Sequence, residues 1–185
     1  ASFQMHSPFR TMSDFTEVVL DGFAKGAPLH HHIVFKAHPL EDDRVPLAPE
    51  ILRLARKFDI ADRVHFLRGG KLARVLSGAK AAVTVNSTAG QQALWRGLPL
   101  RAFGTAVYGK PGLVSDQPLA EFFSDPHRPD VQAYRDFRQF LLETSQVPGG
   151  FYSARGRAQA LRRVQVAKKG MFVGIGGRQD RKSVV

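Results

Sequence analysis

Two spacings of apolar residues alternate along the first hundred positions of the chain. Short runs rich in valine, isoleucine and phenylalanine predict buried strands at 31–39, 63–67, 80–86 and 99–103. Between these runs, apolar residues recur every three or four positions, which predicts helices over 14–25, 50–58, 71–79 and 89–96. Further helical patterns follow at 118–123, 130–145 and 153–169, separated by turns rich in proline and glycine.

Strands that alternate with helices of this length pair in parallel, because the crossover helix returns the chain to the same end of the sheet. The predicted fold class is therefore α/β: a Rossmann-like parallel sheet with flanking helices, followed by C-terminal helices. We assign 1–152 to this domain and 153–185 to a basic helix and flexible tail. Asp14 with Glu17 resembles a capping box at the start of the first helix, and Gly26 is placed to end it.

The net charge of +11 is concentrated at the C-terminal end. From Arg155 onward there are nine Lys or Arg residues and one acid, Asp180, so the preceding residues carry a net charge of only +3. This body needs no polyanionic partner. The tail has one aromatic residue, Phe172, for stacking on bases, so we predict no nucleic-acid partner and leave an anionic membrane surface open. The absence of cysteine, and of any apolar run of membrane-spanning length, fits a cytoplasmic protein.

Polar residues follow two of the predicted strands at the ends where parallel α/β sheets bind their ligands. Lys36-Ala37-His38-Pro39 ends the first strand, and Pro39 keeps His38 extended so that its imidazole projects from the strand end. Asn86-Ser87-Thr88-Ala89-Gly90 follows the third strand and opens a helix. Free N–H groups and the dipole at a helix N-terminus favour a phosphate, and two hydroxyls add donors.

Each of these residues also has an ordinary structural explanation. Ser87 is the type of residue that caps a helix, and His38 fits an ordinary surface position. Gly90 can allow a ligand to approach the backbone, or can allow helix and strand to pack. What favours a ligand site is that both polar sets would face one crevice at one edge of the sheet.

Other motifs carry less information. His30-His31-His32 suggests a metal, but successive residues of a strand point to opposite faces, so we expect no metal site there. Gly69-Gly70 is interpreted as a turn, with contact to a ligand as the second choice. Glu41-Asp42-Asp43 is most simply a solvated loop. The sequence has no Ser–His–Asp triad, no paired-carboxylate spacing and no zinc pattern.

Four segments, taken in order, resemble a known family. They are "HSPF" from His6, "FKAHPLE" from Phe35, the block 83–114, and "FRQFLLETSQVPGGFY" ending at Tyr152. Together they resemble the bacterial capsule polysaccharide biosynthesis/export proteins that are retaining β-Kdo transferases. Those enzymes transfer 3-deoxy-manno-octulosonic acid (Kdo) from CMP-Kdo to a lipid acceptor or a growing Kdo linker. The resemblance runs from about Gln4 to Tyr152.

The resemblance implies that this chain is the nucleotide-binding half of a two-domain, GT-B-type glycosyltransferase in capsular polysaccharide linker biosynthesis. Its donor substrate would be CMP-Kdo, without a cofactor or metal, and its other partner a lipid or Kdo-linker acceptor. Residues implied in holding the CMP phosphate are Lys36, His38, Pro39, Asn86, Ser87, Thr88 and Gly90, with Ser7 and Gly69 as further candidates. The catalytic residue is unknown and expected upstream of Ala1, so the chain looks like a fragment that binds nucleotide without transferring sugar.

Two alternatives remain open. A nucleotide-sugar epimerase also has His-Pro after a strand, but it places acidic residues and paired glycines where "NSTAG" stands here. The other alternative is a basic membrane-binding module. In the predicted helix 153–169, an apolar stripe either packs on the body or lets the basic residues hold the protein peripherally on the inner membrane. If the chain itself transfers sugar, Glu41, Asp42 and Asp116 are the first acids to test.

Overall fold

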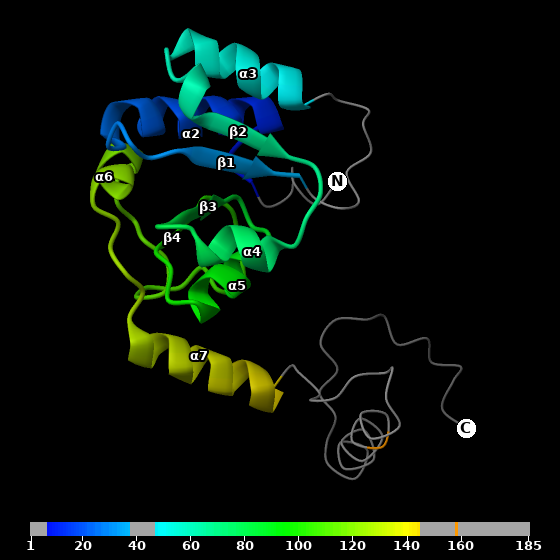
Figure 1. The fold of residues 1–185 in the computed structure, drawn as a ribbon. Helices are drawn as coiled ribbons and strands as arrows, with labels where there is room; N and C mark the ends of the chain where they lie inside the picture. Colours follow the sequence, from blue (N-terminus) through cyan, green and yellow to red (C-terminus); the bar gives the residue numbers. More distant parts are fainter. Residues whose placement is uncertain (1–6, 38–46, 145–157, 159–185) are drawn as a thin grey trace. The chain divides into compact units, whose positions relative to one another are not determined.

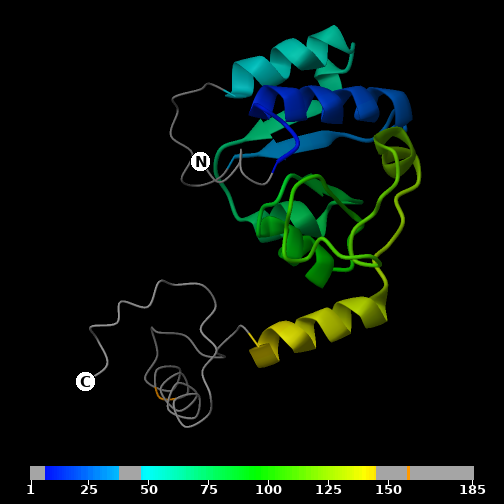
Figure 2. The same ribbon diagram turned by 180° about the vertical axis from the view of Figure 1, so that it is seen from behind.

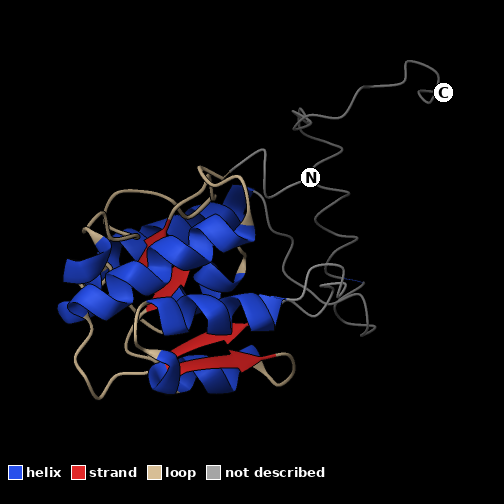
Figure 3. Cartoon of the chain, turned by 90° about the horizontal axis from the view of Figure 1, so that it is seen from above, coloured by secondary structure: helices blue, strands red, loops and turns tan. Residues whose placement is uncertain are grey.

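The computed structural model describes residues 7–37, 47–144 and 158. Its elements are α2 (Met12–Gly26), β1 (Ile33–Lys36), α3 (Leu47–Lys57), η1 (Ala61–Arg63), β2 (Val64–Leu67), α4 (Leu72–Ser77), β3 (Ala82–Thr84), α5 (Ala89–Trp95), β4 (Leu100–Ala102), α6 (Leu119–Ser124) and α7 (Val131–Thr144) (Figure 1). Short strands are set among longer helices (Figure 3). The chain forms two compact units, Ala1–Phe137 and Arg138–Val185, and the features below belong to the first.

Parallel strands alternate with helices, so the predicted Rossmann-like α/β class is confirmed. The helices and strands predicted up to Thr144 are present, with ends that differ by a few residues. The predicted helix 153–169 lies outside the described residues, apart from the helical Ala158, and the domain boundary after Tyr152 stays a prediction.

The strands pair in two separate ladders. β1 pairs with β2, with Ile33 opposite Val64, and β3 pairs with β4, with Ala82 opposite Leu100. Helix α3 connects the first pair and α5 the second, so each pair is a βαβ unit. We predicted one parallel sheet, but among the described residues no backbone ladder joins the two pairs. Contact between the pairs is made by side chains instead.

Helix α2 supplies side chains to that contact. Its first half supplies Phe15 and Val19 to a buried cluster with Val85, which follows β3. Its second half supplies Leu20 and Phe23 to a cluster with α3. Two β1 residues, Ile33 and Phe35, pack against both clusters. Each such buried side chain stabilises the fold by about 1.5–3 kcal/mol, so α2 is a principal link between the two strand pairs. Seen from behind, α2 again lies beside α3 and β1 (Figure 2).

The N-terminus of α2 is fixed by a capping box, three residues before the predicted one. The Thr11 side chain accepts from the Asp14 N–H at 3.1 Å, and the Asp14 carboxylate accepts from the Thr11 N–H at 2.9 Å. The predicted Asp14–Glu17 box is therefore wrong, because α2 begins at Met12 and Asp14 already lies in its first turn. Glu17 instead forms an ion pair with Lys57 of α3. The predicted end at Gly26 is confirmed, and the Ala27 N–H caps the Phe23 carbonyl.

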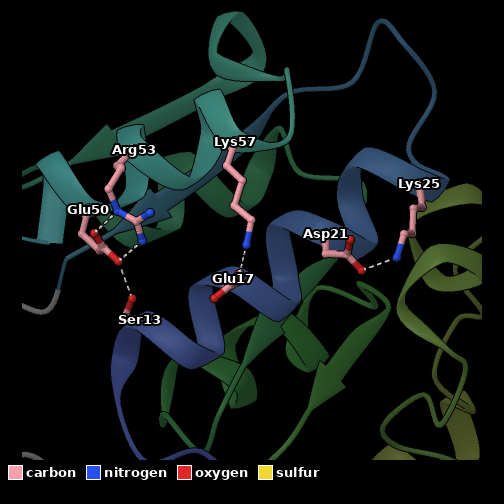
Figure 4. A network of polar contacts seen from close by, with 7 residues as sticks. All are labelled: Ser13, Glu17, Asp21, Lys25, Glu50, Arg53 and Lys57. Carbon is pink, nitrogen blue, oxygen red and sulfur yellow. Dashed lines mark hydrogen bonds and ion pairs between the residues drawn. The ribbon is translucent and has the colours of Figure 1, made fainter.

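Polar contacts on the surface also join α2 to α3 (Figure 4). The Glu50 carboxylate accepts from the Ser13 hydroxyl and receives two bonds of 2.8 Å from Arg53. These hydrogen bonds, Arg53 first, lower the pKa of Glu50 to about 2, so the network stays charged through ordinary acidic conditions. Because exposed ion pairs contribute little free energy, the network orients α3 on α2 while the apolar clusters supply the stability.

Two glycines on one face of α2 allow α6 to approach closely. A Cβ added at Gly22 would lie 2.4 Å from the Cβ of Leu119, and one added at Gly26 would lie 1.9 Å from the carbonyl oxygen of Ala120. Residues four apart share a helix face, so both glycines serve the same contact. At Gly26 the obstacle is backbone, which cannot move aside as a side chain can.

A third cluster lies around α5 and β4, and Tyr108 is its largest buried member. Leu94, Leu100 and Leu113 pack with it. Burial of the ring raises the pKa of Tyr108 to about 12, because the charged phenolate is poorly solvated there.

Replacing Gly26 by alanine is expected to lower the free energy of unfolding by about 1–3 kcal/mol, the usual cost of overpacking a tight contact. Gly78→Ala is the matched control, because Gly78 has a negative φ of −100° and open space around its Cβ. The control should unfold in urea with unchanged stability or gain up to about 1 kcal/mol. Equal urea midpoints for Gly26→Ala and wild type would show that α6 does not pack this closely.

Tyr108 should ionise late in an alkaline titration. Unfolded tyrosine ionises near pH 10, whereas the folded state holds Tyr108 neutral to about pH 12. The unfolded state therefore loses its proton first, and stability falls as the pH rises from about 10 to 12. Tyrosinate absorbance should show a late phase that Tyr108→Phe removes and Tyr134→Phe keeps, with circular dichroism verifying that the chain is still folded. A single phase near pH 10 would contradict the burial of this hydroxyl.

Candidate functional site: the turn between β3 and α5

The polar turn that the sequence singled out connects β3 to α5. β3 ends at Thr84, and Val85 and Asn86 form a bend. Thr88 is the N-cap residue of α5, which begins at Ala89. Asn86 therefore lies two residues beyond the end of β3, whereas we predicted that Asn86 itself ends the strand. Ser87 and Thr88 lie just before the first turn of α5 and not within it, because the bend at Val85 and Asn86 separates the end of β3 from the start of the helix.

Ser87 is the most strongly fixed residue of this turn. Its N–H donates to the Thr84 hydroxyl at 3.3 Å, and its own hydroxyl oxygen accepts from the Ala89 N–H at 3.2 Å. Its carbonyl accepts from the Tyr108 hydroxyl and, at 2.9 Å, from the Gly90 N–H. The Ser87 hydroxyl thus satisfies the N–H of Ala89, the first residue of α5, although the N-cap position itself is Thr88 and not Ser87 as considered. The hydroxyl proton can still be donated to a ligand.

Gly90 serves the packing of this turn. An added Cβ would lie 2.5 Å from both the Cζ and the hydroxyl oxygen of Tyr108. Only glycine therefore leaves room for the buried ring whose hydroxyl holds the Ser87 carbonyl. Of the two roles considered for Gly90, packing is confirmed, and contact with a ligand stays a prediction.

The start of α5 offers fewer free N–H groups than the sequence suggested. The N–H groups of Ala89, Gly90 and Gln91 all donate to oxygens of Ser87 or Thr88. The Thr88 side chain makes no capping bond and is exposed, and Asn86 is partly exposed. An anion at this turn would therefore be met mainly by the Asn86 amide and the hydroxyls of Ser87 and Thr88.

The other candidate residues lie at further strand ends. Lys36 is the last residue of β1, and its ammonium group donates to the Ala37 carbonyl at 3.0 Å. Gly69 is exposed in the bend that follows β2. The next residue in this bend, Gly70, has a φ of +83°. The Ser7 hydroxyl accepts from the Phe9 N–H at 3.0 Å. His38, Pro39, Glu41 and Asp42 lie outside the described residues, and Asp116 is exposed in the loop before α6.

Packing against α2 brings two of these strand ends together. Phe35 of β1 and Val85 after β3 belong to the same apolar cluster around Phe15 and Val19. Lys36 and Asn86 are the residues that directly follow Phe35 and Val85. Within the part of the chain described, no hydrogen bond joins Lys36, Ser7 or Gly69 to Asn86–Thr88. The structure thus places Lys36 and the turn beside one cluster without linking them directly.

The N-terminal segment reaches the same end of the core. The ring of Phe9 packs edge-on against Phe15 and Phe103, with centroids 5.4 Å away in both cases. Phe103 follows β4, so the segment that contains Ser7 passes near the carboxyl end of the second strand pair. Contact between Ser7 and the turn stays a prediction, and among the described residues no such packing links the segment of Gly69 to this end of the core.

Sequence reasoning missed Thr84 and Tyr108, which both bond to Ser87. Thr84 was visible only as a strand residue, and Tyr108 as a tyrosine in the block 83–114. Neither gives a sign of where its hydroxyl points. The described residues include no group of three His, Cys, Asp or Glu residues placed to hold a metal ion. Nor do they include a helix that is both long and apolar enough to cross a bilayer.

Comparison with known proteins gives a consistent result. A model of the family described as capsule polysaccharide biosynthesis protein matches residues 1–152. The capsule polysaccharide export protein KpsS of Escherichia coli is 32% identical over 147 residues, which are 80% of this chain and 38% of that protein. The capsule polysaccharide modification protein LipB of Neisseria meningitidis serogroup A is 30% identical over 151 residues, 81% of this chain and 36% of that protein.

The chain therefore spans little more than a third of the length of these relatives. No solved structure matches it significantly. The family match covers α2 through α7 and includes each candidate residue at the strand ends. On this evidence the chain belongs to the capsule polysaccharide biosynthesis protein family.

Proposed function

We propose that this chain is the donor-binding part of a CMP-Kdo-dependent glycosyltransferase that acts in capsule polysaccharide assembly. The observation that carries the proposal is the polar turn Asn86–Thr88, which lies within the residues matched by the family model. This turn directly follows Val85, which belongs to the same apolar cluster as Phe35 near the end of β1. In parallel α/β folds this is the end of the strands where ligands bind. His38 and Pro39 directly follow this end of β1 in sequence.

The residues at this end suit the phosphate of a CMP-sugar. When the bond from the sugar to the phosphate oxygen breaks, the electron pair stays on the phosphate and CMP leaves as a more highly charged monoester. The Lys36 ammonium group, the Asn86 amide and the hydroxyls of Ser87 and Thr88 would stabilise that charge. Because Tyr108 and Thr84 hold Ser87 in place, its hydroxyl needs little reordering to do so.

The epimerase alternative is less well supported. Residues 84–90 contain no carboxylate and no paired glycines, which are the groups expected in such a turn. We assign acceptor binding to the part of the longer relatives that this chain does not match. We assign the catalytic group to the same part. A peripheral location on the inner face of the membrane remains part of the proposal for residues 155–182, which are outside the described residues apart from Ala158.

Titration with CMP tests the phosphate site, and Thr88→Val is the sharpest variant. The Thr88 side chain is exposed and caps nothing, so its replacement should leave the fold intact. Loss of a hydrogen bond to a charged phosphate should weaken CMP binding by about 1.5–3 kcal/mol, or roughly ten- to a hundredfold. His38→Ala should weaken binding by a similar amount. Ser77→Ala, at the end of α4, is the control and should bind like wild type.

Titration with cytidine tests whether the turn binds the phosphate, and titration with UDP-sugars tests whether the donor is a CMP-sugar. Cytidine lacks the phosphate, so its affinity should be low and should not change in Thr88→Val. If Thr88→Val and His38→Ala both bind CMP as tightly as wild type, the phosphate does not sit at this turn. Tighter binding of UDP-sugars than of CMP or CMP-Kdo would instead reject the proposed donor.

A further inference from the structure

Two histidines from neighbouring strands meet on the surface of the β1–β2 pair. His32 directly precedes β1, and His65 is the second residue of β2, opposite Val34 in the register. The Nδ1 of His32 and the Nε2 of His65 are 2.9 Å apart, and the ring centroids are 5.0 Å apart. The interplanar angle is 26°. Both side chains are exposed.

We propose that His32 and His65 form a two-histidine site for a divalent transition-metal ion such as Ni²⁺, Cu²⁺ or Zn²⁺. Imidazole nitrogens bind these ions at about 2.0–2.1 Å, so two of them on one ion lie about 2.8–3.4 Å apart at common coordination angles. The observed 2.9 Å falls within this interval. The pair is held at this separation by strand pairing, because both residues belong to the β1–β2 ladder or adjoin it.

The chemistry of the pair allows a metal ion to take the place of the hydrogen that the two rings share. Without metal, one ring nitrogen carries a hydrogen and the other accepts it. A metal ion would take one lone pair from each neutral imidazole, and the ring whose facing nitrogen carried the hydrogen would adopt its other tautomer, so no net proton is released. The rings must turn slightly so that both nitrogens point at the ion, and exposed side chains have room for this.

The surroundings fit an open, exchangeable site. Val34 and Leu67, on the same two strands, are each 40% exposed, so solvent reaches this face of the pair. Among the described residues no third His, Cys, Asp or Glu joins the two histidines in a metal-binding group. Two protein ligands leave the other coordination positions to water or to an oxygen ligand. His30 and His31 instead pack edge-on against each other, with centroids 4.6 Å apart.

Titration of the folded chain with Ni²⁺ tests this site. We expect one Ni²⁺ per chain at micromolar concentrations, and a rise in Tm with Ni²⁺ concentration, because the ion binds the folded arrangement of two strands. His32→Ala and His65→Ala should each weaken binding by at least about tenfold and abolish the rise in Tm. His30→Ala, in the same tripeptide, is the matched control and should bind like wild type. Mg²⁺, which prefers oxygen ligands, should not bind.

Several results would overturn the proposal. Binding that survives both His32→Ala and His65→Ala would show that Ni²⁺ finds its ligands elsewhere. Binding that is weakened by His30→Ala and not by His65→Ala would show that Ni²⁺ binds the tripeptide alone. Absence of saturable binding up to millimolar Ni²⁺ would also reject the site. Circular dichroism of each variant separates loss of ligand from loss of fold.

Discussion

The packing of helix α2 is the constraint on which the rest of this structure depends. The described residues form two βαβ units whose strands share no backbone ladder, so their relative position relies on side chains. The first half of α2 packs with Val85 beyond β3, and the second half packs with α3. Since α2 runs into β1 through a short connection, its N-terminal half lies beside the carboxyl end of β1. The same half therefore brings the carboxyl ends of β1 and β3 together.

The turn after β3 shows how a small polar segment can be fixed before any ligand binds. A buried tyrosine hydroxyl holds the Ser87 carbonyl, and Gly90 leaves room for the ring. The turn uses its own oxygens to satisfy the first N–H groups of α5. This internal satisfaction stabilises the turn, but it removes the N–H groups that a helix terminus usually offers to an anion. An anion at this turn would consequently be bound by side chains and not by the backbone.

Periodicity predicted the elements well because it reflects which side of each segment is buried. The alternation of strand and helix is a local property of the sequence, so the α/β class and most boundaries could be read directly. The capping box was misplaced because Thr11–Asp14 and Asp14–Glu17 both have suitable spacing, and the helix begins one turn earlier than its apolar pattern indicated, with Thr11 as the N-cap. The separation into two strand pairs was also unpredictable, since a ladder depends on residues distant in the chain.

The candidate site was predictable to a similar extent. Its residues could be found, because strand ends and small polar residues are visible in the sequence. Their partners could not be found, because the direction of a hydroxyl or an imidazole depends on tertiary packing. Tyr108 is separated from Ser87 by α5 and β4, and His65 is separated from His32 by β1, α3 and η1, although each pair is in contact. The histidine triplet was judged by alternation along one strand, which says nothing of the neighbouring strand.

The proposed metal pair and the proposed phosphate turn occupy opposite ends of β1, which separates their chemistry. His32 precedes the strand and Lys36 ends it, so the two positions are four residue steps of extended chain, about 13 Å, apart. An ion held by His32 and His65 is therefore too distant to coordinate a phosphate beside Lys36 and Asn86. Neutralisation of charge on that phosphate must come from the groups at the carboxyl end itself. In the proposed site, the groups that stabilise the phosphate charge are therefore Lys36, the hydroxyls of Ser87 and Thr88, and the residues that directly follow β1.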